Sequence, residues 1–213
     1  MSLTKTDAQS SKAPKEASYQ AEFLLGAVSP SQYPEEDLPE IAFAGRSNAG
    51  KSSLLNSLLN RRKLARVSSM PGRTRELNFF LIDKSWRLVD LPGYGFARVD
   101  RRQRNVWEQG IGDYLSTRRN LRAVALLLDI RRGVTDHDEE MLEYLFQRGI
   151  PVIIVATKID KLKANPRRAA MQKLKAEIKE KAPLLIASPV ATSSLDGKGM
   201  PELRALIKQV LET

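Results

Sequence analysis

From residue 40 onward, short runs of apolar residues alternate with longer stretches in which apolar positions recur every three or four residues. The short runs are typical of buried strands, and the longer stretches are typical of amphipathic helices. This alternation favours an α/β fold, with a mostly parallel sheet flanked by helices on both faces. The pattern predicts a six-stranded sheet, with strands at residues 41–44, 77–82, 86–89, 123–129, 152–156 and 184–187.

Capping signals locate the helices between these strands. Asp136 with Glu139 three residues later has the pattern of a capping box that opens a helix, and Gly149 should end it. Asn165 followed by Pro166 is typical of a cap and a first-turn proline. The remaining helices are expected over residues 50–60, 102–116 and 203–211.

The ends of the chain differ from its middle in composition. Residues 1–20 carry almost no large apolar side chains and are expected to form a disordered tail. Residues 21–39 hold a short apolar piece and a polar lead-in, and residues 21–213 are expected to form one domain. No apolar run is long enough to span a membrane and no secretory signal is visible. Neither observation conflicts with the expected cytoplasmic location, and a monomer is expected.

Charge is concentrated in one span. The net charge is +10, and residues 61–132 hold 17 Lys and Arg against 7 Asp and Glu. Such a surplus predicts a basic patch for an anionic partner such as RNA, the alternative being a solvated basic surface. The absence of cysteine excludes disulfides, zinc–thiolate sites and a cysteine nucleophile.

One segment matches the phosphate-loop pattern G-x-x-x-x-G-K-[ST] between a predicted strand and a predicted helix. Backbone N–H groups of such a loop surround phosphate oxygens, Lys51 reaches the β- and γ-phosphates, and the hydroxyl of Ser52 binds Mg²⁺. The candidate residues are Gly45, Arg46, Ser47, Asn48, Ala49, Gly50, Lys51, Ser52 and Ser53.

Two further segments are candidates for sensing the γ-phosphate. Asp90 ends a predicted strand, where P-loop enzymes place an acid that holds Mg²⁺, directly or through water. The N–H of Gly93 can meet the γ-phosphate, and Thr74 can bind both the metal and that phosphate. Lys51, Thr74 and Gly93 are thus the candidate catalytic residues, and the two loops add Gly72, Arg73, Arg75, Glu76, Leu91 and Pro92 to the candidate binding residues.

Base choice is expected to depend on the segment Thr157, Lys158, Ile159 and Asp160. The carboxylate of Asp160 can accept hydrogen bonds from both N1–H and the N2 amine of guanine, whereas adenine would leave it unpaired. The stem of Lys158 can lie along the purine. The wider consensus has Asn at the position of Thr157. A later loop, Thr192, Ser193 and Ser194, follows the last predicted strand, where GTPases contact guanine O6.

These segments occur in the order found in translation-factor-class GTPases. In detail they resemble the EngB family, a member of the TrmE-Era-EngA-EngB-septin-like class, over about residues 22–211. The Thr-Lys-x-Asp variant and the Pro-Gly-Tyr-Gly run at 92–95 are specific to that family. The resemblance implies a Ras-like P-loop GTPase fold, GTP and GDP as ligands, Mg²⁺, and a role in assembly of the large (50S) ribosomal subunit with effects on cell division and septation.

The resemblance leaves the completion of the catalytic site open. Tyr94 stands where Ras-like enzymes have a water-positioning glutamine, so intrinsic hydrolysis is expected to be slow. Asn48 either helps to bind a potassium ion, as in related GTPases, or simply stiffens the loop. For the partner, direct contact with rRNA or the large subunit through residues 61–132 is the leading hypothesis. The alternative is a GTPase that signals to a protein at the division site.

Overall fold

The computed structural model describes residues 19–60, 76–94 and 110–213, and its centre is a seven-stranded sheet. The strands are β1 (Ala21–Ala27), β2 (Glu40–Gly45), β3 (Leu77–Ile82), β4 (Trp86–Asp90), β5 (Leu121–Asp129), β6 (Val152–Thr157) and β7 (Val190–Ala191). Their order across the sheet is β1-β3-β4-β2-β5-β6-β7, and β3 runs antiparallel to both of its neighbours, β1 and β4. The predicted α/β class and mostly parallel sheet are confirmed.

The parallel strands β4, β2, β5 and β6 form the middle of the sheet. Every residue of β2, β4 and β6 is buried, as expected for strands covered by helices on both faces. The register pairs Phe43 of β2 with Asp90 of β4, and Asp129 of β5 with Thr157 of β6. The carboxyl ends of all four strands therefore lie at one edge, where ligand-binding loops of α/β proteins gather.

The edge strand β1 was not predicted, so the prediction of six strands is wrong by one. β1 pairs antiparallel with β3 and has a register shift between Phe23 and Leu25. An edge strand with a bulge lacks strict alternation of buried and exposed residues, and Phe23 is 50% exposed. Its ring packs on Phe80 with 5.5 Å between centroids. Pairing with β3, rather than a local pattern, makes this segment a strand.

The last strand lies later in the chain than predicted. Within residues 184–187 only Leu185 pairs, through an isolated bridge to Val152, whereas Val190 and Ala191 pair with β6. Leu185 and Ile186 are partly buried against the cores on the two faces of the sheet. The apolar run that suggested a strand therefore reflects packing and not strand pairing.

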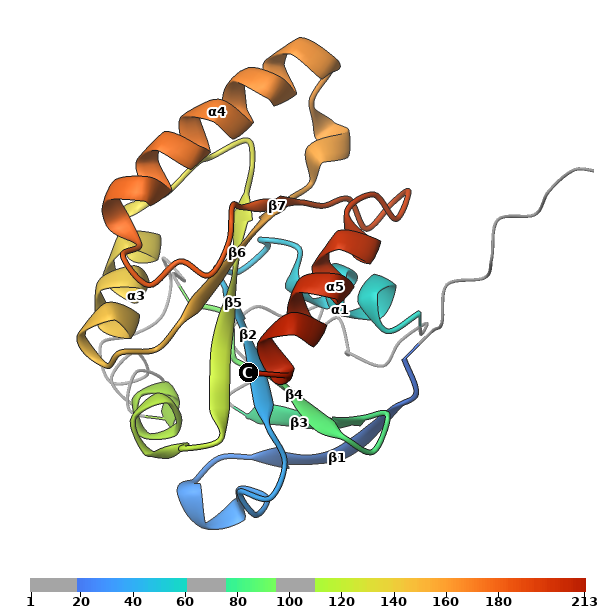
Figure 1. Ribbon diagram of the computed structural model, residues 1–213, viewed down its shortest axis with the longest axis vertical. Helices are drawn as coiled ribbons and strands as arrows, with labels where there is room; N and C mark the ends of the chain where they lie inside the picture. The colour runs from blue at the N-terminus through green and yellow to red at the C-terminus, as the bar shows by residue number, and fades with distance from the viewer. Residues whose placement is uncertain (1–18, 61–75, 95–109) are drawn as a thin grey trace, which may run out of the picture.

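Helices cover both faces of the sheet. They are α1 (Lys51–Leu58), α3 (Asp136–Gln147), α4 (Ala164–Lys181) and α5 (Met200–Leu211), with short 3-10 turns η1 (Pro30–Gln32) and η2 (Ile159–Lys161). Residues 110–117 are also helical, and the predicted start of that helix lies outside the described residues. Figure 1 shows α3 and α4 on one side of the sheet and α1 and α5 on the other. None of the described helices is both long and apolar enough to cross a membrane.

Two helix starts differ from the prediction. Thr135 caps α3, and Asp138 Oδ2 accepts from the Thr135 N–H at 3.0 Å and from its hydroxyl at 2.6 Å, so the capping box is Thr135–Asp138 and not Asp136–Glu139. The run of acids after Thr135 fits the pattern in more than one register. α4 begins at Ala164, one residue before the predicted cap, which places Pro166 in the first turn, where an N–H has no intrahelical partner.

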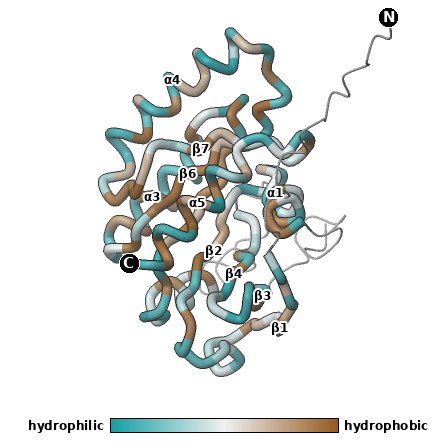
Figure 2. The backbone as a smooth tube through the Cα atoms, turned by 45° about the vertical axis from the view of Figure 1, so that its right-hand side comes forward, coloured by the Kyte–Doolittle hydropathy of each residue, from teal (hydrophilic) through white to brown (hydrophobic). Residues whose placement is uncertain are grey.

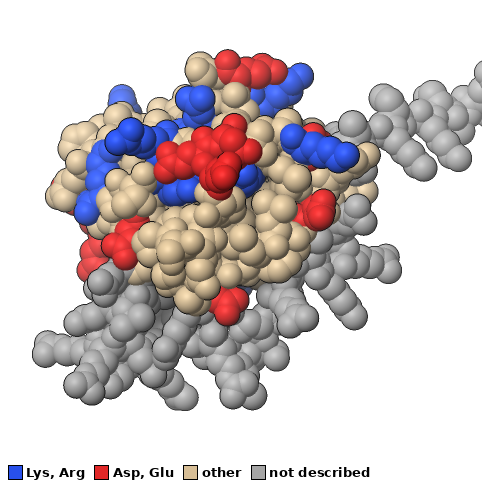
Figure 3. Space-filling view, turned by 90° about the horizontal axis from the view of Figure 1, so that it is seen from below, with Lys and Arg blue, Asp and Glu red and all other residues tan. Residues whose placement is uncertain are grey.

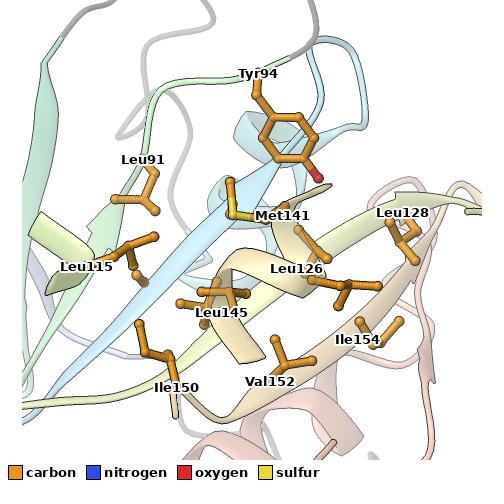
Figure 4. Packing of buried hydrophobic residues seen from close by; sticks show 14 of the residues in the cluster. Leu91, Tyr94, Leu115, Leu126, Leu128, Met141, Leu145, Ile150, Val152 and Ile154 are labelled. Atoms are coloured by element: carbon orange, nitrogen blue, oxygen red, sulfur yellow. The ribbon is translucent and has the colours of Figure 1, made fainter. Parts of the chain in front are cut away.

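Each face of the sheet has its own apolar core. One core lies under α3, α4 and the helical residues 110–117, and the other lies under α1 and α5. Figure 4 shows side chains of α3 packed over those of β5 and β6 in the first core. Along the chain in Figure 2, hydrophobic colour follows the central strands, while α4 is largely hydrophilic. Only Leu174 and Ile178 of α4 are fully buried.

A charged network is buried at the amino end of β2, opposite the edge where the loops gather. The fully buried carboxylate of Glu40 accepts hydrogen bonds from the Tyr114 hydroxyl at 2.8 Å and from Arg118 Nε at 3.2 Å, and a second nitrogen of Arg118 contacts its other oxygen. Arg87 Nη1 lies 3.8 Å from Glu40, and Arg87 also pairs with Asp37 at 2.5 Å. The polar lead-in is thereby tied to the sheet.

This network takes up two cations of the predicted basic patch at residues 61–132, which stays a prediction. Arg87 and Arg118 belong to that span, yet they are only 6% and 9% exposed and are neutralised internally. Ten of the 17 cations of the span lie outside the described residues. On the face shown in Figure 3, basic and acidic side chains lie next to one another and do not form a uniform basic field.

We expect Glu40→Gln to lower the free energy of unfolding by about 3 kcal/mol, because Arg118 loses the charge of its buried partner. The measurement is equilibrium urea unfolding. Glu36→Gln is the matched control, since Glu36 lies 3.8 Å from the same guanidinium but is partly exposed, and it should cost less than about 1 kcal/mol. Equal losses for the two variants would contradict a structural role for the buried pair.

Candidate functional site

The phosphate-loop segment connects β2 to α1, the context that its pattern requires. Asn48 and Gly50 have left-handed backbone conformations, with φ of 64° and 97°. These residues turn the chain sharply, and the Ala49 N–H donates to the Arg46 carbonyl at 2.9 Å. A Cβ on Gly50 would lie 3.4 Å from Cε of Lys158 in a conformation that L residues disfavour. The loop ends at the N-terminus of α1, where N–H groups without helical partners attract anions.

Lys51, the first residue of α1, forms an ion pair with Asp90, the last residue of β4. Each side chain is 12% exposed, so the pair is partly enclosed yet open to a small ligand. Pairing continues beyond β4, where the buried Leu91 donates its N–H to the Phe43 carbonyl at 3.0 Å, followed by the buried Pro92. The structure thus brings the two ends of the predicted phosphate and metal site into contact.

The donor chemistry of this corner fits Mg²⁺ bound together with a nucleotide. Within the described residues, no group of three or more His, Cys, Asp and Glu side chains could hold a metal by itself. Ser52 and Asp90 offer one hydroxyl and one carboxylate, which are hard oxygen ligands. Mg²⁺ in P-loop sites takes its remaining ligands from phosphate and water, so a set of two protein ligands is sufficient.

The loop after β4 is bound to the phosphate loop through its backbone. Tyr94 N–H donates to the Gly45 carbonyl at 3.3 Å, and Ser47 N–H donates to the Tyr94 carbonyl at 3.0 Å. A Cβ on Gly93 would lie 3.4 Å from the Ser47 nitrogen, so Gly93 lies in van der Waals range of the phosphate-loop backbone. A movement of one loop would therefore strain or break hydrogen bonds to the other.

The Tyr94 side chain points away from this corner and into the core under α3, as Figure 4 shows. Its hydroxyl donates to Asp138 Oδ1 at 2.7 Å, while Oδ2 of Asp138 caps α3. Burial and the neighbouring Asp138 raise the pKa of Tyr94 well above its ordinary value. The phenol at the position of the glutamine is thus a protonated core side chain in this structure.

Thr157 connects the segment after β6 to the phosphate loop. Its hydroxyl lies 2.6 Å from the Ala49 carbonyl and 3.2 Å from the Leu128 carbonyl, and the side chain is buried. Because a hydroxyl has one proton, the shorter contact to Ala49 is the hydrogen bond that dominates. Thr157, although it departs from the Asn consensus, therefore forms a direct hydrogen bond between the segment after β6 and the phosphate loop.

Lys158 meets an acid that the sequence reasoning missed. Its ammonium contacts the Asn48 carbonyl and lies 3.1 Å from Oδ2 of Asp129, the last residue of β5. Arg131 donates to the same carboxylate from Nε at 2.9 Å and from Nη2 at 2.6 Å. Burial raises the pKa of Asp129, but hydrogen bonds from Arg131 and Lys158 outweigh it and hold the pKa well below its usual value. The sequence did contain a signal for Asp129, because it is an acid at the end of a predicted strand.

Asp160 lies in η2, next to the loop at 192–194. Partial burial raises its pKa, but hydrogen bonds from Lys161 and Ser193 outweigh this and hold the pKa below its usual value. The two loops are joined because Ile159, buried beneath, donates its N–H to the Thr192 carbonyl at 3.3 Å. The structure therefore brings the predicted loop of Thr192, Ser193 and Ser194 to the predicted base-recognition segment.

Other predicted site residues are not tested in this way. Gly72, Arg73, Thr74 and Arg75 lie outside the described residues. Glu76 is exposed, and its carboxylate oxygen lies close to Gly26 of β1, only 2.6 Å from the position that a Cβ on Gly26 would take. Glu76 directly precedes β3, in which Asn78 pairs with Asp90 of β4, so Glu76 follows the same edge of the sheet and its role in binding stays a prediction.

A phosphate loop, an acid at the end of β4 and a Thr-Lys-x-Asp segment thus meet at one edge of a Ras-like sheet, and this arrangement defines a P-loop GTPase. A family model described as 50S ribosome-binding GTPase matches residues 40–158, and one for the elongation factor Tu GTP-binding domain matches residues 114–213. The chain belongs to the EngB family of GTP-binding proteins.

Relatives of the family are similar over most of the chain. The EngB protein of Streptococcus sanguinis is 48% identical over 181 residues, covering 84% of this chain and 92% of its own. That of Alkaliphilus metalliredigens is 55% identical over 142 residues, 67% of this chain and 68% of its own. A solved EngB structure superposes with a TM-score of 0.63 at 26% identity, over 81% and 98% of the two chains. Era, solved with MgGDPNP and a segment of 16S ribosomal RNA, has a TM-score of 0.60 at 27% identity, over 82% and 56%.

We expect Thr157→Val to speed the release of a fluorescent GDP analogue by about tenfold. The change keeps the shape of the side chain but leaves the buried Ala49 carbonyl without its donor, a loss of about 1–3 kcal/mol shared between folding and nucleotide binding. Stopped-flow release of the analogue measures the effect.

Thr157→Ser is the control, because it keeps the hydroxyl and loses only a methyl group. Its release rate should stay within about threefold of the wild type. If the valine variant releases the analogue as slowly as the serine variant, the tie between the two loops does not support nucleotide binding.

Proposed function

We propose that this GTPase is a Mg²⁺-dependent switch with slow intrinsic hydrolysis that acts in assembly of the large ribosomal subunit, in the cytoplasm and as a monomer. The observation that carries the proposal is the meeting of the phosphate loop, Asp90 and the 157–160 segment at one edge of the sheet. Ribosome assembly is favoured by the description of the matching family model.

At the phosphate end, Lys51 binds the β- and γ-phosphates, and Ser52 and Asp90 hold Mg²⁺, Asp90 directly or through water. Thr74 and the Gly93 N–H contact the γ-phosphate and so distinguish GTP from GDP. The solved complex of Era with MgGDPNP supports the choice of metal. Hydrolysis is slow because the Tyr94 phenol is bound to Asp138 and does not position water. Either K⁺ near Asn48 or an activator on the ribosome completes the site.

At the base end, Asp160 accepts N1–H and the N2 amine of guanine, and Lys158 covers the purine. The hydrogen bond from Ser193 and the lowered pKa support this role, because they keep the carboxylate oriented and ionised near neutral pH. A buried carboxylate facing adenine would lose about 3 kcal/mol, which corresponds to about 100-fold preference for guanine nucleotides.

We expect Asp160→Asn to lose GTP affinity and to gain affinity for xanthosine triphosphate, whose C2 oxygen can accept from the new amide. The wild type should prefer GTP to ATP by at least about 100-fold. Competition against a fluorescent GDP analogue measures all three nucleotides. Equal binding of ATP and GTP by the wild type, or no gain of xanthosine nucleotide by the variant, would contradict base recognition by Asp160.

RNA is the favoured partner because of charge and kinship. Era, a structural relative, was solved with ribosomal RNA. Among the described residues, the exposed side chains of Arg168, Lys175 and Lys179 on α4 make no ion pair. Their spacing of seven and four residues puts them on one face, about 10 Å and 6 Å apart along the axis. Figure 1 shows α4 at the rim of the molecule, accessible to a large partner.

Two charge-reversal variants locate the contact. One replaces Arg98, Arg101, Arg102 and Arg104 by Glu, within the predicted basic span, and the other replaces Arg168, Lys175 and Lys179. We expect at least one variant to lose about tenfold or more in co-sedimentation with large ribosomal subunits, because each neutralised phosphate adds to the salt dependence of binding. GTP affinity should stay within about threefold. A non-hydrolysable GTP analogue is present throughout.

The control reverses Lys84, Lys198 and Lys208, which are exposed but lie on other elements. It should sediment as the wild type does at matched salt. If the wild type itself fails to sediment with large subunits and is crosslinked instead to a division-site protein, the alternative of a protein-directed switch replaces the proposal. Unchanged sedimentation of both test variants would exclude an electrostatic RNA contact at either surface.

A further inference from the structure

Asp129 lies between the phosphate loop and the base-recognition segment, and its carboxylate is fully engaged. It ends β5, pairs in register with Thr157 of β6, and is 7% exposed. The Arg131 side chain and backbone N–H and the Lys158 ammonium supply four donors, at 2.6 to 3.1 Å. Asp129 is therefore a buried acid that binds two cations, Arg131 and Lys158, beside the predicted ligand site.

The second cation of this cluster is close enough to influence the base-recognition carboxylate. The Arg131 side chain is 43% exposed, and its pKa is raised first by the hydrogen bond and charge of Asp129 and then by the charge of Asp160. Arg131 and Asp160 follow the ends of the neighbouring strands β5 and β6, where Asp129 pairs with Thr157 and the Lys158 ammonium reaches Asp129 at 3.1 Å. The guanidinium is held on Asp129 through two parallel N–H donors.

Guanine and arginine present the same hydrogen-bonding pattern to a carboxylate. The N1–H and N2 amine of guanine are two parallel donors, and so are the Nε–H and Nη2–H of a guanidinium. The Lys161 ammonium lies 3.2 Å from Oδ2 of Asp160, but a guanine or a guanidinium could engage both carboxylate oxygens at once. An arginine released beside Asp160 would therefore compete with guanine for the same two oxygens.

We propose that Asp129 is a specificity-determining positioning residue that holds Arg131 and Lys158 away from Asp160, so that the Asp160 carboxylate stays available for guanine. The proposal rests on the proposed pairing of Asp160 with guanine. Asp129 touches neither the base nor the phosphates in this scheme. It acts through the two cations, and it keeps the Lys158 ammonium between Asn48 and itself, which extends the lysine stem between the phosphate loop and β5.

The scheme makes a prediction that a merely structural role does not make. In Asp129→Asn, Arg131 pairs with Asp160, and GDP must displace it. ADP does not use Asp160, and the arginine now satisfies the carboxylate that adenine would leave unpaired. GDP affinity should fall by about tenfold while ADP affinity holds or rises, so the preference for GDP over ADP falls by at least about tenfold.

Competition against a fluorescent GDP analogue, at fixed Mg²⁺ and salt, measures GDP, GTP and ADP on each variant. The ratio of GDP to GTP affinity should not change, because the defect lies at the base end. Arg131→Gln in the Asp129→Asn background removes the competitor and should restore the preference to within about threefold of the wild type. Arg131→Gln alone is the matched control for loss of that side chain, and should change the preference by less than Asp129→Asn does.

Asp129→Ser provides a second neutral variant if Asp129→Asn does not purify in a folded form. Equal losses for GDP and ADP, or no rescue by Arg131→Gln, would overturn the proposal in favour of a purely structural acid. Asp160→Asn in the same assay distinguishes a failure of guanine recognition by Asp160 from a failure of the positioning role of Asp129. If it gains no affinity for xanthosine diphosphate, base recognition by Asp160 fails first. If it gains that affinity while Asp129→Asn keeps the preference for GDP, only the role of Asp129 fails.

Discussion

The parallel pairing of β2 with β4 on one side and β5 on the other is the constraint on which the rest of the structure depends. Because the strands run in the same direction, their carboxyl ends fall at one edge of the sheet. The phosphate loop, Asp90 and Asp129 are separated by many residues in sequence, yet each directly follows or ends one of these strands. The segment after β6 joins them because β6 pairs in parallel with β5. The strands are buried on both faces, so the edge is held rigidly while the loops beyond it can respond to a ligand.

At that edge, hydrogen bonds and ion pairs between the loops fix the positions of the loops relative to one another. Thr157 joins the base-recognition segment to the phosphate loop, and the Tyr94 backbone joins the loop after β4 to the same phosphate loop. A nucleotide that contacts any one of these segments therefore acts on all of them. Asp129 adds a charged contact, because it binds Arg131 and the Lys158 ammonium beside the phosphate loop.

The opposite end of β2 shows how a basic chain uses some of its charge internally. Glu40 binds Arg118 and Arg87 in a buried network, and Arg87 also holds the polar segment before β2 through the Glu35 carbonyl. Such a network contributes more to fixing one arrangement than to net stability, since desolvation offsets much of its attraction. A surplus of cations in a stretch of sequence is consequently no measure of the charge that a partner meets. Exposed and unpaired cations, such as those on α4, are the relevant ones.

The sequence by itself determined the α/β class, the central strands, the phosphate loop and the family, because buried runs, a glycine-rich loop and ordered motifs are local signals. Only the tertiary structure decided that β1 is a strand, since an edge strand is defined by the neighbour that it pairs with. The partners of Asp129 and Tyr94, and the burial of Arg87 and Arg118, were also decided there. These features depend on which side chains the parallel sheet brings within hydrogen-bonding distance, and residues far apart in sequence give no local sign of that.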